Sequence, residues 1–279
     1  MYGVRVSEAM KSRVCTVKDY TSVGDCIKVM AIKGFRRLPV VDEDKTLLGI
    51  VTATDVINYF GGGGYYGIIE VKYKGGFKEA LREPVSSIMT KGVVKVGLED
   101  DLSIVLEKMD KFKVGGLPVV SDNNKVLGII TEMDVLSLLI EKASNDLKVG
   151  DVMVRDVVTI DGSESLKKLA KKMIDCGVRK LPVILDDEVI GVASTMDVVR
   201  YLASSEPFRH TVLGLVEEVM SVRVIDIIQP GVVSVDPSTD IRKAYEIMVE
   251  EGVDFLIVVI AGKLRGIVTE RDLLSACIK

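Results

Sequence analysis

Four Ser/Thr-x-x-Asp elements of this 279-residue chain each follow a short apolar run that contains a glycine. The four elements are Thr52–Asp55, Thr131–Asp134, Ser194–Asp197 and Thr269–Asp272. Each precedes an apolar run typical of a helix, and a helix N-terminus offers free N–H groups and partial positive charge to a phosphate. The hydroxyl can donate to a phosphate oxygen, and the carboxylate can accept from two vicinal hydroxyls such as those of ribose. The pattern therefore suits a nucleotide.

The same residues are also close to a capping box, which only closes off a helix N-terminus. The usual partner in that motif is Glu or Gln, whereas all four elements use the shorter Asp. Repetition does not separate the two interpretations, because a duplicated cap is still a cap. A binding role and a capping role both stay open at this point.

Basic residues favour phosphate binding in the first and third copies. Arg36-Arg37 and Arg179-Lys180 stand just before Pro39 and Pro182, in the same register. The second copy has Gly115-Gly116 there, so it could hold an uncharged or bulky group or use basic residues from another repeat.

The fourth copy has Asp254-Phe255 in this place, and Asp254 would repel the one nearby candidate for phosphate, Arg271. The predicted nucleotide-binding residues are Arg36, Arg37, Thr52, Asp55, Thr131, Asp134, Arg179, Lys180, Ser194, Asp197, Thr269, Arg271 and Asp272.

Each element ends a longer repeat. Pro39, Pro118, Pro182 and Ile257 hold equivalent places, and Met10, Met89, Met153 and Ile228 mark the start of the repeats. Apolar residues at i, i+4 and i+7 predict a helix before each Pro or Ile, and two short apolar runs around a polar turn predict strands after it. Each repeat is therefore predicted as strand, helix, strand, strand and helix, which is an α/β fold.

The links between repeats are unequal, long after Asp55 and Asp197 but short after Asp134. This predicts a duplicated double unit with one pair of repeats in residues 1–143 and the other in 144–279. The repeats span about 8–60, 85–141, 149–203 and 224–279. Gly61–Gly64 in the first long link is predicted to stop a helix and begin a flexible loop.

Composition argues against several classes of function. The net charge of -4 does not favour nucleic acid, and no apolar run could cross a bilayer or act as a signal segment, so a cytoplasmic protein is expected. The four cysteines lack zinc-site spacing and are expected to be buried free thiols. The single histidine, His210, has no evident partner for nucleophilic catalysis. We expect no enzyme activity, no catalytic cofactor and no metal.

The Gly-x-x-x-x-Pro-Val-Val and apolar-Gly-apolar-apolar-Ser/Thr-x-x-Asp segments resemble cystathionine-β-synthase (CBS) motifs over nearly the whole chain. Four motifs in one chain resemble the gamma subunit of AMP-activated protein kinase and its single-chain archaeal relatives. The resemblance implies two pseudo-twofold pairs that form a disc, and clefts between motifs that bind AMP, ADP or ATP. It also implies a regulated protein partner, a kinase or another enzyme, and leaves a homodimer open. S-adenosylmethionine as the ligand, or a ligand-free assembly scaffold, are the alternatives.

Overall fold

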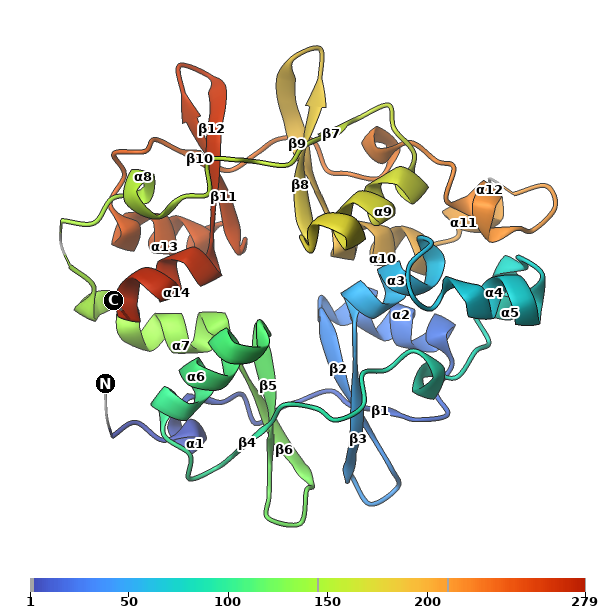
Figure 1. Cartoon of the computed structure of the whole chain (residues 1–279), viewed down its shortest axis with the longest axis horizontal. Coiled ribbons are helices and arrows are strands. Elements are labelled where there is room, and N and C mark those ends of the chain that lie inside the picture. The colour runs from blue at the N-terminus through green and yellow to red at the C-terminus, as the bar shows by residue number, and fades with distance from the viewer. Residues whose placement is uncertain (1–2, 145, 210, 279) are drawn as a thin grey trace. The chain divides into compact units, whose positions relative to one another are not determined.

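The computed structural model describes residues 3–144, 146–209 and 211–278, so His210 lies outside the described residues. It contains the predicted order of strand, helix, strand, strand and helix four times (Figure 1), which confirms the α/β class. Repeat one comprises β1 (Val17–Lys18), α2 (Val23–Lys33), β2 (Arg37–Val41), β3 (Leu47–Thr52) and α3 (Ala53–Phe60). Repeat two comprises β4 (Val96–Gly97), α6 (Leu102–Phe112), β5 (Gly116–Val120), β6 (Val126–Thr131) and α7 (Glu132–Leu139). Repeat three comprises β7 (Ile160–Asp161), α9 (Leu166–Cys176), β8 (Lys180–Leu185), β9 (Glu188–Ser194) and α10 (Thr195–Ala203). Repeat four comprises β10 (Ser234–Val235), α13 (Ile241–Glu250), β11 (Phe255–Ile260), β12 (Lys263–Thr269) and α14 (Glu270–Ile278).

The three strands of each repeat form one small sheet with the middle strand in its centre. In repeat one, β2 pairs in parallel with β1 and antiparallel with β3. The parallel step needs a crossover, and α2 supplies it. The other three repeats have the same topology.

The first helix of each repeat ends where the chain turns into a left-handed conformation. Gly34, Gly177 and Gly252 adopt this conformation with φ of 68°, 64° and 64°, as is usual for a residue that ends a helix. Lys113 stands in the same place in repeat two with φ of 53°. In repeat two, Lys113 replaces this glycine, and its left-handed backbone conformation costs about 1–2 kcal/mol because the residue has a Cβ atom.

The described residues divide into two compact units, and each is considered by itself. Unit 1 consists of the described parts of Met1–Val14, Val94–Val157 and Val232–Lys279, and thus holds repeats two and four. Unit 2 consists of the described parts of Cys15–Val93 and Val158–Gly231, and holds repeats one and three. The division into residues 1–143 and 144–279 groups the repeats by sequence order instead, and it stays a prediction.

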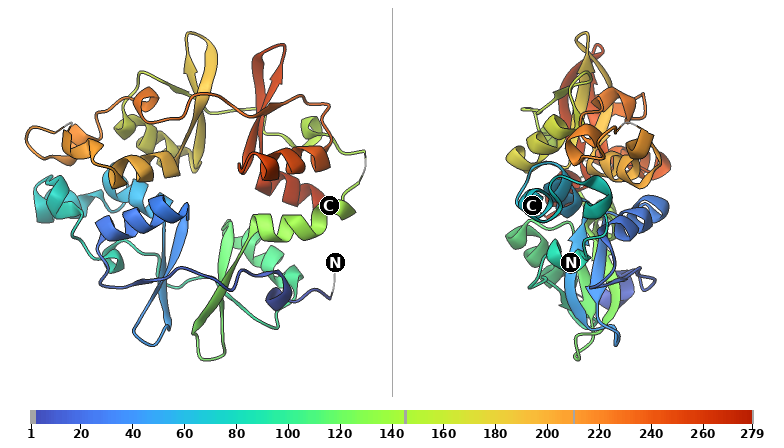
Figure 2. Two further views of the ribbon diagram at one scale, coloured as in Figure 1. Left: turned by 180° about the vertical axis from the view of Figure 1, so that it is seen from behind. Right: turned by 90° about the vertical axis from the view of Figure 1, so that its right-hand side faces the viewer.

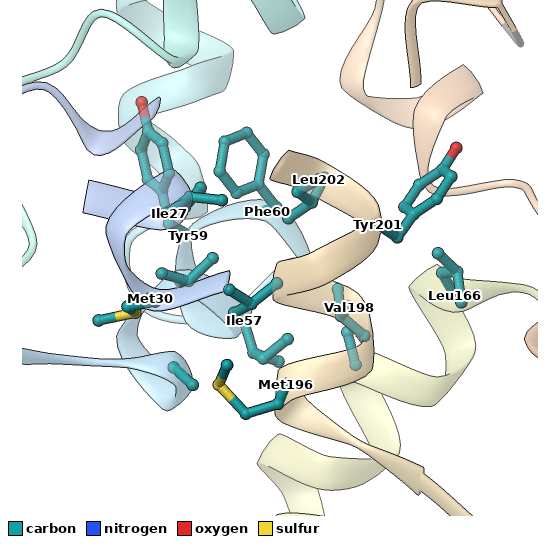
Figure 3. Close-up of a cluster of buried hydrophobic side chains, with 14 of the residues drawn as sticks. Ile27, Met30, Ile57, Tyr59, Phe60, Leu166, Met196, Val198, Tyr201 and Leu202 are labelled. Carbon is teal, nitrogen blue, oxygen red and sulfur yellow. The ribbon is translucent and has the colours of Figure 1, made fainter. Parts of the chain in front are cut away.

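Helices from two repeats meet in the core of each unit. In unit 2, Ile57 and Phe60 of α3 lie beside Val198 and Leu202 of α10, and all four are buried (Figure 3). In unit 1, α7 and α14 lie side by side (Figure 1) and bury Leu136 and Leu273. Burying a side chain of this size contributes about 1.5–3 kcal/mol, so each unit depends on both of its repeats.

The residues that lead into each repeat do not pack on that repeat. We call them leading segments, and they contain α1 (Val6–Ala9), η1 (Val85–Ser87), α8 (Val149–Val152) and η3 (Val224–Asp226). In unit 1, the leading segment of repeat one runs beside repeat two, where the N–H of Lys11 donates to Ile129 O at 2.9 Å and Ile129 donates back at 3.0 Å. In unit 2, the leading segment of repeat two bonds to repeat one in the same way, through Thr90 and Ile50 at 3.0 and 2.9 Å.

Repeats three and four exchange leading segments as well. Val154 and Ile267 bond to each other at 2.9 and 3.0 Å in unit 1, and the segment with η3 bridges to Gly191 of repeat three in unit 2. Figure 2 shows from behind how these segments cross the hairpins. Each leading segment therefore packs on the repeat that neighbours its own repeat in sequence.

The glycine of each third strand lies directly under an exchanged segment. A Cβ atom on Gly128 would lie 2.8 Å from Met10 Sδ and 2.7 Å from Lys11 O, and one on Gly49 would lie 2.5 Å from Met89 Sδ. Gly266 faces Met153, and Gly191 faces Ile228. The repeated Met or Ile and the repeated glycine are thus two sides of one contact.

The long links fold into helices of their own. Gly61 ends α3 as predicted, and a Cβ there would overlap Ala170 of α9. Beyond it the first link forms α4 (Tyr66–Tyr73) and α5 (Phe77–Ala80), and the other long link forms α11 (Glu206–Arg209) and α12 (Val216–Val219). The glycines Gly61–Gly64 thus form the helix stop and turn that were expected, and only the rest of the link is helical.

The buried carboxylate of Glu83 fastens the first link. It accepts from Lys72 Nζ at 2.7 Å, from the Tyr73 hydroxyl and from Ser87 Oγ. Burial tends to raise the pKa of Glu83, but the hydrogen bonds from Lys72, Ser87 and Tyr73 hold it below the usual value.

Among the described residues, no helix has the length and apolar character that crossing a membrane requires.

The glycine contact predicts a specific sensitivity to substitution. Gly128→Ala should lower the free energy of unfolding by about 1–3 kcal/mol, because the new methyl group must displace backbone and not only the flexible Met10 side chain. Gly97→Ala is the matched control, since a Cβ there would meet nothing closer than 4.0 Å. Urea unfolding of both variants measures the difference, and equal losses would contradict the contact.

Candidate functional site

Each Ser/Thr-x-x-Asp element stands at the junction of a third strand and the following helix. In repeat one the backbone N–H and the hydroxyl of Thr52 both donate to Asp55 Oδ2, at 2.8 and 2.7 Å. The Asp55 N–H donates to Thr52 Oγ1 at 3.3 Å, which completes a reciprocal cap. Thr131–Asp134 and Ser194–Asp197 form the same cap, and in Thr269–Asp272 the carboxylate accepts the same two bonds. The capping interpretation is thus correct as far as one carboxylate oxygen is concerned.

The second carboxylate oxygen differs among the four copies. Asp134 Oδ1 lies 2.9 Å from Lys11 Nζ, and Asp197 Oδ1 lies 2.5 Å from Arg200 Nη2. For Asp55 and Asp272, none of the described residues donates to Oδ1. Two of the copies therefore hold a carboxylate oxygen ready to accept from a ligand.

The first helical N–H of each copy is already used within the protein. Ala53 donates to Arg36 O at 2.9 Å, and Thr195 donates to Arg179 O at 3.0 Å. In repeats one to three, the N–H of the third helical residue donates to the Ser or Thr hydroxyl. The N–H of the second helical residue is therefore the donor that the cap does not use. An open N–H beside a carboxylate can serve a ligand that both accepts and donates.

The register of the strands places the predicted basic residues at the same junction. Arg37 lies opposite Thr52, and Lys180 lies opposite Ser194. In repeats two and four the residues opposite Thr131 and Thr269 are Gly116 and Phe255. The structure thus brings Arg37 and Lys180 next to the elements they were expected to serve, with Arg36 and Arg179 one residue earlier in the chain.

Arg271 is not arranged as expected from the sequence. Its Nε lies 2.6 Å from Oε1 of Glu132, a side chain that is only 2% exposed. Glu132 Oε2 and Arg271 Nη2 are buried without a partner among the described residues. A role of Arg271 in phosphate binding stays a prediction, and the sequence did not indicate the ion pair with a residue of repeat two.

Asp55 is buried and forms no ion pair with a cation among the described residues. Burial raises its pKa above the ordinary value, and the hydroxyl and N–H of Thr52 offset only part of this effect.

Nearby Cys26 is buried too, and burial raises the pKa of its thiol to about 12. All four cysteines were expected to be buried, but only Cys26 is: Cys15 and Cys277 are half-buried, and Cys176 at the end of α9 is exposed. Within the described residues, no group of His, Cys, Asp and Glu could hold a metal ion.

Asp55 should therefore affect stability in a pH-dependent way. Because its folded pKa lies above the unfolded value of about 3.9, its contribution is most favourable below about pH 4 and is lost as the pH rises through the folded pKa. Between about pH 3 and 7, wild type should lose stability relative to Asp55→Asn as the pH rises, measured by urea unfolding.

Asp42→Asn is the control with the opposite sign. The backbone N–H of Thr46 is the main cause that lowers the pKa of Asp42. Its contribution is present above about pH 4 and is lost as the pH falls. The same slope for both variants would contradict the assignment for Asp55.

Comparison with known proteins places this architecture in a family. The CBS domain model matches residues 6–62, 85–141, 149–204 and 224–279. Protein MJ1225 of Methanocaldococcus jannaschii is 32% identical over 275 residues, 98% of each chain. Its crystal structure, described as that of a proposed archaeal homologue of g-AMPK, has a TM-score of 0.92 and covers 98% of this chain and 99% of that one. A 33.4 kDa protein from a ribosomal RNA operon of Thermofilum pendens is 30% identical over 98% of this chain and 91% of its own. The chain belongs to the CBS domain family, and its four repeats are tandem CBS motifs.

Proposed function

We propose that this chain is a non-catalytic regulatory protein that binds AMP, ADP or ATP at its Ser/Thr-x-x-Asp elements and signals to a partner enzyme. The similarity to MJ1225 along the whole chain supports this, since that protein is described as a proposed homologue of g-AMPK. Nucleotides with different numbers of phosphates would shift the population between arrangements of the repeats to the extent that their affinities for these arrangements differ.

One observation carries the proposal: the Asp55 side chain is largely buried, yet its Oδ1 has no donor among the described residues and is not itself fully covered, so a ligand can reach it. A ribose diol suits this oxygen, because its two hydroxyls can both donate to one carboxylate. Arg37 opposite Thr52 supports a phosphate on the same ligand.

The element at the start of α2 is a cap of a similar kind that is not among the predicted binding sites. Ser22 and Asp25 form the same kind of reciprocal pair, in which Ser22 Oγ donates to Asp25 Oδ2 at 2.7 Å and accepts from the Asp25 N–H at 3.0 Å. The Asp25 side chain, however, is 63% exposed, whereas that of Asp197 is 9% exposed. Water can satisfy Asp25, so it offers a matched control for the buried aspartates.

Replacing the aspartates should separate binding from capping. Asp55→Ala and Asp197→Ala each remove charged hydrogen bonds worth about 1.5–3 kcal/mol, so AMP affinity at that copy should fall about tenfold or more. The loss of a cap costs only about 1 kcal/mol, so the fold should survive. Calorimetric titration with AMP and 2′-deoxy-AMP gives the affinities, and the deoxy analogue should bind more weakly to wild type.

Asp25→Ala removes a cap without touching a predicted site, so it should melt lower and bind AMP as wild type does. If Asp55→Ala and Asp197→Ala behave in the same way as Asp25→Ala, the elements are caps and the chain is a scaffold. If 2′-deoxy-AMP binds as tightly as AMP, the aspartates do not hold ribose.

The basic residues of repeats one and three should distinguish phosphate ligands from other adenosyl ligands. Arg36→Ala combined with Arg179→Ala should weaken ATP and ADP more than adenosine, and should flatten the dependence on salt, since exposed charges are screened within about 10 Å at 0.1 M. Titrations at two salt concentrations measure both effects. Equal losses for ATP and adenosine, together with tight binding of S-adenosylmethionine, would favour the sulfonium ligand instead.

A further inference from the structure

Lys11 reaches the Ser/Thr-x-x-Asp element of a repeat to which it does not belong in sequence. Its backbone is held to β6 by the two hydrogen bonds with Ile129, two residues before Thr131. Its side chain then extends to Asp134, where Nζ lies 2.9 Å from Oδ1. The leading segment of repeat one therefore delivers a cation to repeat two.

Repeat two lacks the basic pair of repeats one and three. It has Gly115 and Gly116 where repeats one and three have Arg36-Arg37 and Arg179-Lys180, and Gly116 is the residue opposite Thr131. The residues that follow Met89, Met153 and Ile228 in the other three leading segments are Thr90, Val154 and Gln229, none of which is charged. The lysine thus occurs in the one leading segment that serves the repeat with two glycines.

The ion pair leaves most of Lys11 in solvent. The Lys11 side chain is 67% exposed, whereas that of Asp134 is 9% exposed. An ammonium group carries three donors on a flexible stem, so Lys11 can keep one bond to Asp134 and still donate to a second acceptor.

We infer that repeat two binds an adenosine ligand that carries a phosphate, with Asp134 accepting from the ribose and Lys11 donating to the phosphate. The inference rests on the proposed function and specifies the ligand class of one site. It assigns Lys11, a residue of the first leading segment, to the site of repeat two. Lys11 then supplies the positive charge that Gly115 and Gly116 lack.

The test uses the full chain with Lys11→Met, Lys11→Arg and the control Lys28→Met. Lys28 is matched because it is 61% exposed and pairs with an aspartate, Asp25, that is not a predicted site residue. In calorimetric titrations, Lys11→Met should weaken AMP at one class of site about tenfold and leave adenosine within about twofold. Lys11→Arg should retain most of the AMP affinity, and Lys28→Met should bind AMP as wild type does.

A double-mutant cycle assigns the effect to repeat two. Lys11→Met added to Asp134→Ala should cost little further AMP affinity, because both changes remove the same site, whereas Lys11→Met added to Asp55→Ala should give independent losses. AMP affinity that is the same in Lys11→Met as in wild type would overturn the inference and leave the proposed function intact. Tighter AMP binding by Lys11→Met would also overturn it, since Lys11 would then block Asp134. A wild-type chain that binds no AMP would instead overturn the proposed function.

Discussion

The structure depends on a close contact between the third strand of each repeat and a segment that comes from another repeat. Two backbones approach so closely at Gly49, Gly128, Gly191 and Gly266 that a side chain has no room. The approach lets the leading segment pair with an edge strand, whose N–H and C=O groups would otherwise need water or another chain. In repeat two it also fixes the distance from Lys11 to the Thr131 junction. Because glycine has no Cβ atom, the leading segment can lie against the third strand, where it covers the strand edge. In repeat two the same contact brings Lys11 to the site.

The four aspartates illustrate how one side chain can serve the backbone and still be available for a ligand. A carboxylate has two oxygens, and the N-cap uses only Oδ2. Asp55 and Asp197 differ from the exposed Asp25 of the Ser22–Asp25 cap in being largely buried, so fewer water molecules can reach their carboxylates. The remaining oxygen then depends on its neighbours: Lys11 for Asp134, Arg200 for Asp197, and no described residue for Asp55 and Asp272. Copies of one motif can therefore differ in ligand preference although their backbones are the same.

The elements of each repeat were predictable, because helix and strand periods are properties of local sequence. The helix predicted before Pro39 and the strands after it are present as α2, β2 and β3. The positions of the leading segments were not predictable in this way, since four similar repeats offer four similar surfaces and the pattern at Met10 is the same for each. The pairs Lys11–Asp134 and Arg271–Glu132 were missed for the same reason, as they join residues far apart in sequence. Three helices of the long links, α5, α11 and α12, were missed because they have four residues each, too few to show a period.

The exchange of leading segments also determines the order in which the chain can complete its fold during synthesis. Gly3 donates to Asp101 at 2.9 Å, a partner 98 residues later, so the segment around Gly3 waits for repeat two to be synthesised. At about 5–20 residues per second, that wait lasts about 5–20 s. During this time the apolar side chain of Val6, which is fully buried in the finished fold, has no partner surface. The nascent chain therefore passes through a period in which its amino-terminal segment is open to chaperones and proteases.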